Sequence, residues 1–184
     1  MSVIELKNDK ISAAFKTMGA ELTSLKDTEG TEYLWQGNPD YWSGQAPVLF
    51  PIIGCLRNGT ASVSGDKTCS FGRHGIARRK EFTLISSTED KAVFSLKADE
   101  ETKKQYPFDF ELQMTYELDG QKLKITHTVI NHDSIPMPFC VGGHPAFNCP
   151  ISEGEDFEDY VVEFEYPETA DCALLNEDAL IDNG

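Results

Sequence analysis

The sequence predicts an all-β fold, and three observations point to it. Apolar and polar residues alternate along most of the chain, which is typical of strands that bury one face. Turn-forming Gly, Pro, Asn and Asp residues separate the alternating segments. Helical periodicity is confined to one short segment. We therefore predict many strands that form a sandwich or a barrel.

The clearest strand signal lies near the middle of the chain. Apolar positions alternate over Phe108–Leu118 and again over Leu123–Val129, and Asp119 and Gly120 stand between them. An Asp-Gly pair is typical of a type I′ turn, which needs positive φ at both central residues. We predict a hairpin of two long antiparallel strands. His127 falls on the apolar face of the second strand and is interpreted as a core histidine.

Shorter segments predict the other elements. One helix of one or two turns is predicted over Asp99–Gln105, with Asp99 as its N-cap and Pro107 as its stop. No internal domain boundary is visible, so residues 1–184 are predicted to form a single domain. The remaining predicted strands are Val3–Leu6, Ile11–Phe15, Ala20–Leu25, Thr60–Val63, Phe82–Ser87, Ala92–Ala98 and Tyr160–Tyr166.

Composition excludes several classes of function. Lys and Arg total 16 and Asp and Glu total 31, so the formal net charge is −15. Nucleic acids and anionic membrane surfaces require a basic face, so neither is an expected partner. No apolar run reaches the length of a membrane span, and no signal peptide is visible. The five cysteines have irregular spacing and are interpreted as reduced thiols in a cytoplasmic protein.

Two segments rich in Gly, Pro, His and aromatic residues interrupt the strand pattern. The first covers residues 46–59 and, after a short gap, 71–78, and the second covers residues 136–150. His144 follows two glycines and precedes a proline, and a loop imidazole suits proton transfer near neutral pH. A loop histidine with a structural hydrogen bond is the alternative interpretation. His74 and Arg78 together could hold hydroxyls or a phosphate, or they could be solvated turn residues.

No metal or cofactor is expected. Cys140, His144 and Cys149 have the spacing C-x3-H-x4-C, which lacks the C-x2-C knuckle of structural zinc sites. The acidic run at residues 153–159 lacks the ligand register of a calcium loop. Neither a phosphate-binding Walker loop nor a dinucleotide fingerprint is present.

Five motifs occur in an order that resembles the aldose 1-epimerase (galactose mutarotase-like) family, and within it the LacX-like branch. They cover nearly the whole chain, and each alone is weak. The motifs are Gly19–Leu25, Leu49–Gly54, Arg57–Gly59, His74–Arg78 and Gly142–Asn148.

This resemblance implies a large antiparallel β-sandwich and an enzyme that interconverts the α and β anomers of an aldohexose without cofactor or metal. It implies that His144 is the catalytic acid and that His74 helps to hold the ring oxygen. Arg57, Arg78 and Asn148 would contact the sugar. In a branch that acts on hexose 6-phosphates, the arginines would contact the phosphate.

The sequence departs from the family pattern at two places. Cys55 stands where the family usually has an arginine that follows the glycine of the P-x-x-G segment. The family pattern continues beyond Gly184 and contains a glutamate base that no residue here matches, so we expect a chain truncated at its C-terminus. A sugar-binding protein without catalysis is therefore the alternative function. Sheet edges exposed by truncation would favour self-association of the chain.

Overall fold

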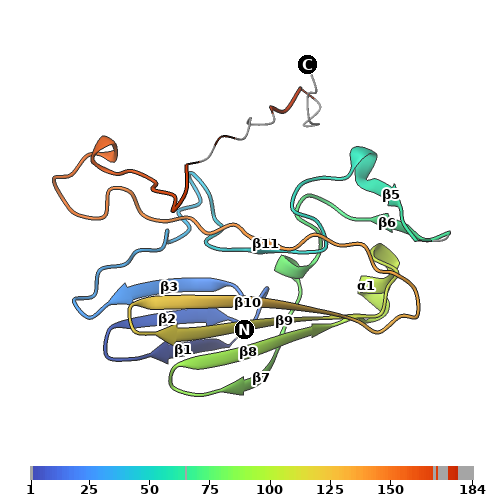
Figure 1. Cartoon of the computed structure of the whole chain (residues 1–184), viewed down its shortest axis with the longest axis horizontal. Coiled ribbons are helices and arrows are strands. Elements are labelled where there is room, and N and C mark those ends of the chain that lie inside the picture. Colours follow the sequence, from blue (N-terminus) through green and yellow to red (C-terminus); the bar gives the residue numbers. More distant parts are fainter. Residues whose placement is uncertain (1, 65, 168, 170–173, 178–184) are drawn as a thin grey trace. The chain divides into compact units, whose positions relative to one another are not determined.

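The computed structural model describes residues 2–64, 66–167, 169 and 174–177. Strands dominate it, and α1 (Glu100–Gln105) is the one α-helix among the described residues (Figure 1). The chain divides into two compact units, residues 1–148 and residues 149–184, which are described separately. That the whole chain forms one domain stays a prediction.

The first unit contains two antiparallel sheets of three and four strands. The three-stranded sheet has the order β1-β2-β3 and the four-stranded sheet has the order β10-β9-β8-β7. The strands are β1 (Val3–Lys7), β2 (Ile11–Lys16), β3 (Leu22–Asp27), β7 (Thr83–Ser87), β8 (Lys91–Lys97), β9 (Phe110–Asp119) and β10 (Lys122–Asn131).

A continuous aromatic and aliphatic core joins the two sheets. Phe15 of β2 lies with its ring centroid 4.2 Å from that of Tyr116 on β9 and 6.2 Å from that of Phe94 on β8. All three rings are buried. The Tyr116 hydroxyl donates a hydrogen bond of 2.6 Å to the carbonyl of Ala20. The predicted all-β, antiparallel sandwich is therefore confirmed.

The turn of the long hairpin differs from the prediction. Asp119 pairs with Lys122, so the two turn residues are Gly120 and Gln121. Only Gly120 has positive φ, at 56°, and the predicted type I′ turn at Asp119-Gly120 is wrong. Because the ladder continues through Asp119, Gly120 occupies the first turn position. The backbone has a positive φ there, which glycine adopts without strain.

Short elements complete the first unit, and the predicted helix is confirmed. Asp99 caps α1 by accepting a hydrogen bond from the backbone N–H of Thr102, whose hydroxyl in turn accepts one from the Asp99 N–H. The other elements are β4 (Val48–Leu49), β5 (Thr60–Ser62), β6 (Thr68–Ser70), β11 (Gly142–Gly143) and the 3-10 turns η1 (Arg57–Gly59) and η2 (Ala77–Arg79).

The described part of the second unit contains the 3-10 turn η3 (Phe157–Asp159). The strand predicted over Tyr160–Tyr166 is wrong, because this segment forms no ladder with another strand. Alternation of side chains gives a strand its two faces but supplies no partner for its backbone.

None of the helices in the described residues is long and apolar enough to span a membrane.

Candidate functional site

The short strand β4 brings together two histidines that are far apart in the sequence. On one side, β11 pairs with β4, with Gly142 opposite Leu49 and Gly143 opposite Val48. His144 follows β11 directly, and its N–H continues the ladder with a hydrogen bond of 3.1 Å to the carbonyl of Pro47. The backbone of His144 is thus fixed by its position in the ladder.

On the other side, the segment around His74 is held by Phe50, which follows β4. Gly75 forms a bridge with Phe50, and the Phe50 carbonyl accepts hydrogen bonds of 2.8 Å from Ile76 N–H and 3.2 Å from Ala77 N–H. A Cβ on Gly75 would lie 2.2 Å from the Phe50 carbonyl oxygen, and its φ is +72°. Only glycine therefore fits beside His74 without displacing the backbone.

The imidazole rings of His74 and His144 lie with centroids 5.7 Å apart and planes at 64°. His74 is half-buried and His144 is exposed. Nδ1 of His74 is hydrogen-bonded to the carbonyl of Ile53. Because a carbonyl only accepts, Nδ1 carries the proton, and Nε2 of the neutral ring is left as an acceptor. The site thus offers one fixed and one exposed imidazole.

Trp42 flanks His144 and was not singled out by the sequence analysis. Its ring centroid lies 5.1 Å from that of His144, and its carbonyl accepts a hydrogen bond of 2.7 Å from the Trp35 indole N–H. A Cβ on Gly44 would lie 2.4 Å from Trp42 Cζ2, so the ring packs directly over Gly44. No sequence pattern connects Trp42 with His144, because the contact arises only in the folded chain.

A buried carboxylate fixes the segment that leads into β4. Glu21, which is 5% exposed, accepts hydrogen bonds through Oε1 from the backbone N–H groups of Gln45 and Ala46 at 3.0 and 2.9 Å. Lys16 lies 2.6 Å from its other oxygen and compensates the charge. Glu21 therefore braces the chain between Trp42 and β4.

Arg78 lies half-buried close to the His74 segment. Its Nη2 donates a hydrogen bond of 3.1 Å to the Arg73 carbonyl, and its buried Nε has no partner among the described residues. Burial is the main cause that lowers the pKa of Arg78, and the charge of Arg79 adds to it. A guanidinium nevertheless stays charged at neutral pH, so Arg78 places a cation beside the His74 segment.

The structure does not bring Arg57 into contact with the two histidines. Arg57 is exposed in η1, and its side chain forms no hydrogen bond or ion pair with another described residue. Its contact with a sugar stays a prediction.

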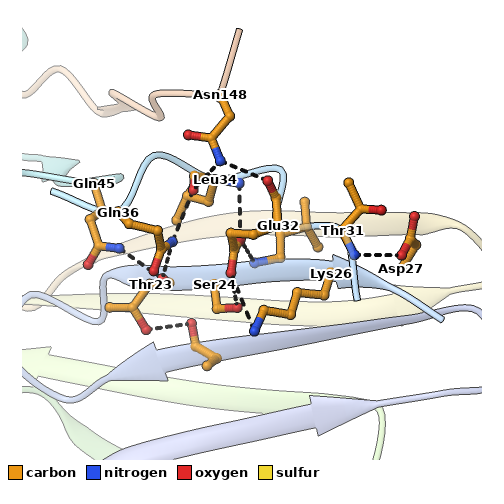
Figure 2. Close-up of polar contacts among 12 residues, drawn as sticks. Thr23, Ser24, Lys26, Asp27, Thr31, Glu32, Leu34, Gln36, Gln45 and Asn148 are labelled. Carbon is orange, nitrogen blue, oxygen red and sulfur yellow. Dashed lines mark hydrogen bonds and ion pairs between the residues drawn. The ribbon is translucent and has the colours of Figure 1, made fainter. Parts of the chain in front are cut away.

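Asn148 braces a loop, as Figure 2 shows. Its Nδ2 donates hydrogen bonds to the carbonyls of Glu32 at 2.7 Å and Leu34 at 3.2 Å. Its backbone N–H donates to the carbonyl of Tyr33 at 2.9 Å. The Glu32 carboxylate in turn accepts from the Leu25 N–H at 2.8 Å. The amide donors of Asn148 are thus engaged within the chain, and its contact with a sugar stays a prediction.

Two further groups bear on the site's chemistry. Within the ranges that the structure describes, no three His, Cys, Asp or Glu side chains gather as a metal site requires. His127 lies half-buried on the inner face of β10, and burial lowers its pKa. A neutral, packed imidazole fits its interpretation as a core histidine.

Comparison with known proteins then decides the family. The aldose 1-epimerase family model matches residues 2–177. The chain belongs to the aldose 1-epimerase family. The LacX proteins of Lactococcus lactis subsp. lactis, plasmid and chromosomal, are 45% identical to it over 176 residues, which cover 93% of this chain and 58% of theirs.

Two further relatives place the chain within the aldose 1-epimerase family. The crystal structure of a galactose mutarotase related enzyme from Lactobacillus acidophilus superposes with a TM-score of 0.82 at 40% identity, over 86% of this chain and 53% of that one. A putative glucose-6-phosphate 1-epimerase of Escherichia coli (strain K12) is 27% identical over 210 residues, 98% of this chain and 68% of that protein. The chain spans a little more than half the length of the LacX proteins and the L. acidophilus enzyme.

Proposed function

We propose that this chain binds an aldohexose and takes part in the interconversion of its α and β anomers. The observation that carries the proposal is the approach of His74 and His144, whose rings lie 5.7 Å apart across β4, in a chain of the aldose 1-epimerase family.

The reaction needs an acid and a base on a bound sugar. His144 as acid gives a proton to the ring oxygen, and the C1–O5 bond breaks. A base takes the proton of the O1 hydroxyl while the C1–O1 double bond forms. Rotation about C1–C2 and the reverse steps close the ring on either face of C1 and restore both protons. His144 suits the acid because its ring is exposed.

His74 suits the orienting role, because its Nδ1 is committed to Ile53. Its Nε2 then accepts a hydrogen bond from a sugar hydroxyl in the neutral ring, or donates one to the ring oxygen when the imidazole is protonated. Arg78 adds a positive charge beside the His74 segment, where its Nη2 donates to the Arg73 carbonyl.

The proposal assigns no residue as the catalytic base. Among the described residues, no carboxylate is hydrogen-bonded or ion-paired to either histidine ring. Sugar binding without catalysis is therefore the alternative function of these residues.

Polarimetry of freshly dissolved α-D-glucose and α-D-galactose tests the proposal. We expect the purified chain to accelerate the change of rotation above the buffer rate, and His144→Gln to remove most of the acceleration. His132→Gln serves as control, since His132 lies on the exposed turn after β10 and should leave the rate unchanged. A folded chain that gives no acceleration overturns catalysis. Saturable chemical shift changes on sugar titration would then support binding alone.

A second candidate substrate is a hexose 6-phosphate. Arg73, Arg78 and Arg79 lie close in sequence to His74, and arginine clusters recognise phosphate. After burial, the charges of Arg79 and Arg73 help to lower the pKa of Arg78. The E. coli relative is also named a glucose-6-phosphate 1-epimerase. A higher rate with glucose 6-phosphate than with glucose, inhibited by inorganic phosphate and lowered by Arg78→Gln, would favour this substrate.

A further inference from the structure

The outer edge of β10 lacks a partner strand. β10 is ten residues long, pairs with β9 without a register shift, and has no neighbour on its other side among the described strands. The edges at β7 and β3 are less suited to pairing. The pairing of β7 with β8 is interrupted by a register shift, and the edge of β3 is covered by Tyr33, whose N–H donates to Leu25. An exposed, regular edge strand is a template for another chain.

The inner face of β10 is only partly covered. Ile125 pairs with Tyr116, which is 2% exposed, yet Ile125 itself is 43% exposed. Leu123 and Gln121 border a groove of about 390 Å³ that Ile11 and Leu25 of the other sheet also line. The apolar row of β10 therefore has room for further side chains beside it.

The outer face of β10 carries two exposed lysines, which stand opposite Asp119 and Glu117 in the ladder with β9. Lys122 and Lys124 are exposed, and neither lies within ion-pair distance of a carboxylate among the residues that the structure describes. A strand that carries acidic residues at alternate positions would place a second carboxylate beside each lysine, on the side away from β9.

Residues 161–166 have this pattern. Apolar Val162, Phe164 and Tyr166 alternate with Glu163 and Glu165. The segment forms no strand in the single chain, and the side chains of Val162, Phe164 and Tyr166 are 82%, 62% and 71% exposed. It combines the alternation and the β-forming residues of a strand with exposed apolar groups that have nothing to pack against.

We propose that residues 161–166 of one copy of this chain pair as an antiparallel strand with β10 of a second copy. Side chains alternate between the two faces of a strand, so the register of the pairing decides whether the charged residues and the apolar residues of the two segments lie on the same faces. With Glu165 opposite Lys122 and Glu163 opposite Lys124, Phe164 falls opposite Leu123 and Val162 opposite Ile125. Both charges and both apolar rows then match in one register. Each copy has one edge and one segment, so two copies that exchange their segments reciprocally close as a dimer.

Charge reversal tests the pairing by light scattering coupled to size exclusion over a range of concentrations. We expect the unaltered chain to run at twice its mass of 20.5 kDa. The double variants K122E/K124E and E163K/E165K should each run as monomers. K103E/K104E makes the same charge change on α1, away from the edge, and should remain dimeric.

Mixing the two charge-reversed variants distinguishes exchange between copies from pairing within one chain. Each variant alone opposes like charges. In a mixed pair, the acidic β10 edge of K122E/K124E meets the basic segment of E163K/E165K, and the reciprocal contact is also complementary. We expect mixing to restore the dimer mass, and circular dichroism to show that both variants are folded. A monomeric unaltered chain, a dimer insensitive to both reversals, or a mixture that stays monomeric overturns the proposal.

Discussion

Replacing Gly75 by alanine should lower the free energy of unfolding more than the same replacement at a glycine with nearly the same φ. Gly75 has a φ of +72°, and an added Cβ would lie 2.2 Å from the Phe50 oxygen and 2.6 Å from the Phe50 carbonyl carbon. Both atoms are backbone and cannot rotate away. The bridge between Phe50 and Gly75 would have to open.

Gly59 supplies the matched control. Its φ is +71°, and an added Cβ would meet nothing within 4 Å. Gly59→Ala therefore measures the cost of the left-handed conformation alone, about 1–2 kcal/mol. Gly75→Ala adds the steric conflict, and overpacking typically costs about 1–3 kcal/mol more. We expect Gly75→Ala to lower the free energy of unfolding by about 2–5 kcal/mol in total.

Urea unfolding followed by circular dichroism gives both free energies, with tryptophan fluorescence as a second probe. The midpoint of Gly75→Ala should lie well below that of Gly59→Ala, with an unchanged slope. Equal losses in the two variants would refute the reasoning, because the Phe50 carbonyl would then not constrain residue 75.

Three further changes test other parts of the structure by the same unfolding assay or by polarimetry. Tyr116→Phe leaves the Ala20 carbonyl without its donor and should cost about 1–3 kcal/mol. Asp99→Ala removes the cap of α1 and should cost about 1 kcal/mol. The hydrogen bond from the Thr102 N–H lowers the pKa of Asp99, so this contribution is present above pH 3.8 and is lost as pH falls further, and the variant should show less acid destabilisation. Trp42→Leu removes the ring beside His144 and should lower any mutarotation rate at least several-fold while Trp35→Phe, which keeps Trp42, has a smaller effect.

Periodicity and local capping determine the parts of the fold that the sequence predicts. The alternation over β8, β9 and β10 selects one buried face for each strand, and a slip by one residue would expose all of it. The cap of α1 depends on Asp99 and Thr102, three positions apart. Such signals lie within one element and need no knowledge of its neighbours.

The missed features all depend on a partner that the local sequence does not contain. The hairpin turn lies one residue later than predicted, because the ladder between β9 and β10 extends to Asp119. Residues 160–166 alternate like a strand but have no ladder in the single chain. The approach of Trp42 to His144 depends on the path of the chain between Trp35 and β4. The family resemblance implied that His74 and His144 serve one site, whereas the distance between their rings follows only from the structure.

The candidate site is therefore held mainly by backbone groups and by charges away from it. β4 contributes two residues, yet His144 pairs beside Pro47 on one flank and His74 precedes the Gly75 bridge to Phe50 on the other. The segment before β4 is fixed by Glu21, whose charge Lys16 compensates. Side chains at positions 74 and 144 can then change without loss of the scaffold. A change at Gly75 should disturb the backbone beside His74, and a change at Glu21 should disturb the segment that leads into β4. Histidine variants therefore report on chemistry, while these two positions report on geometry.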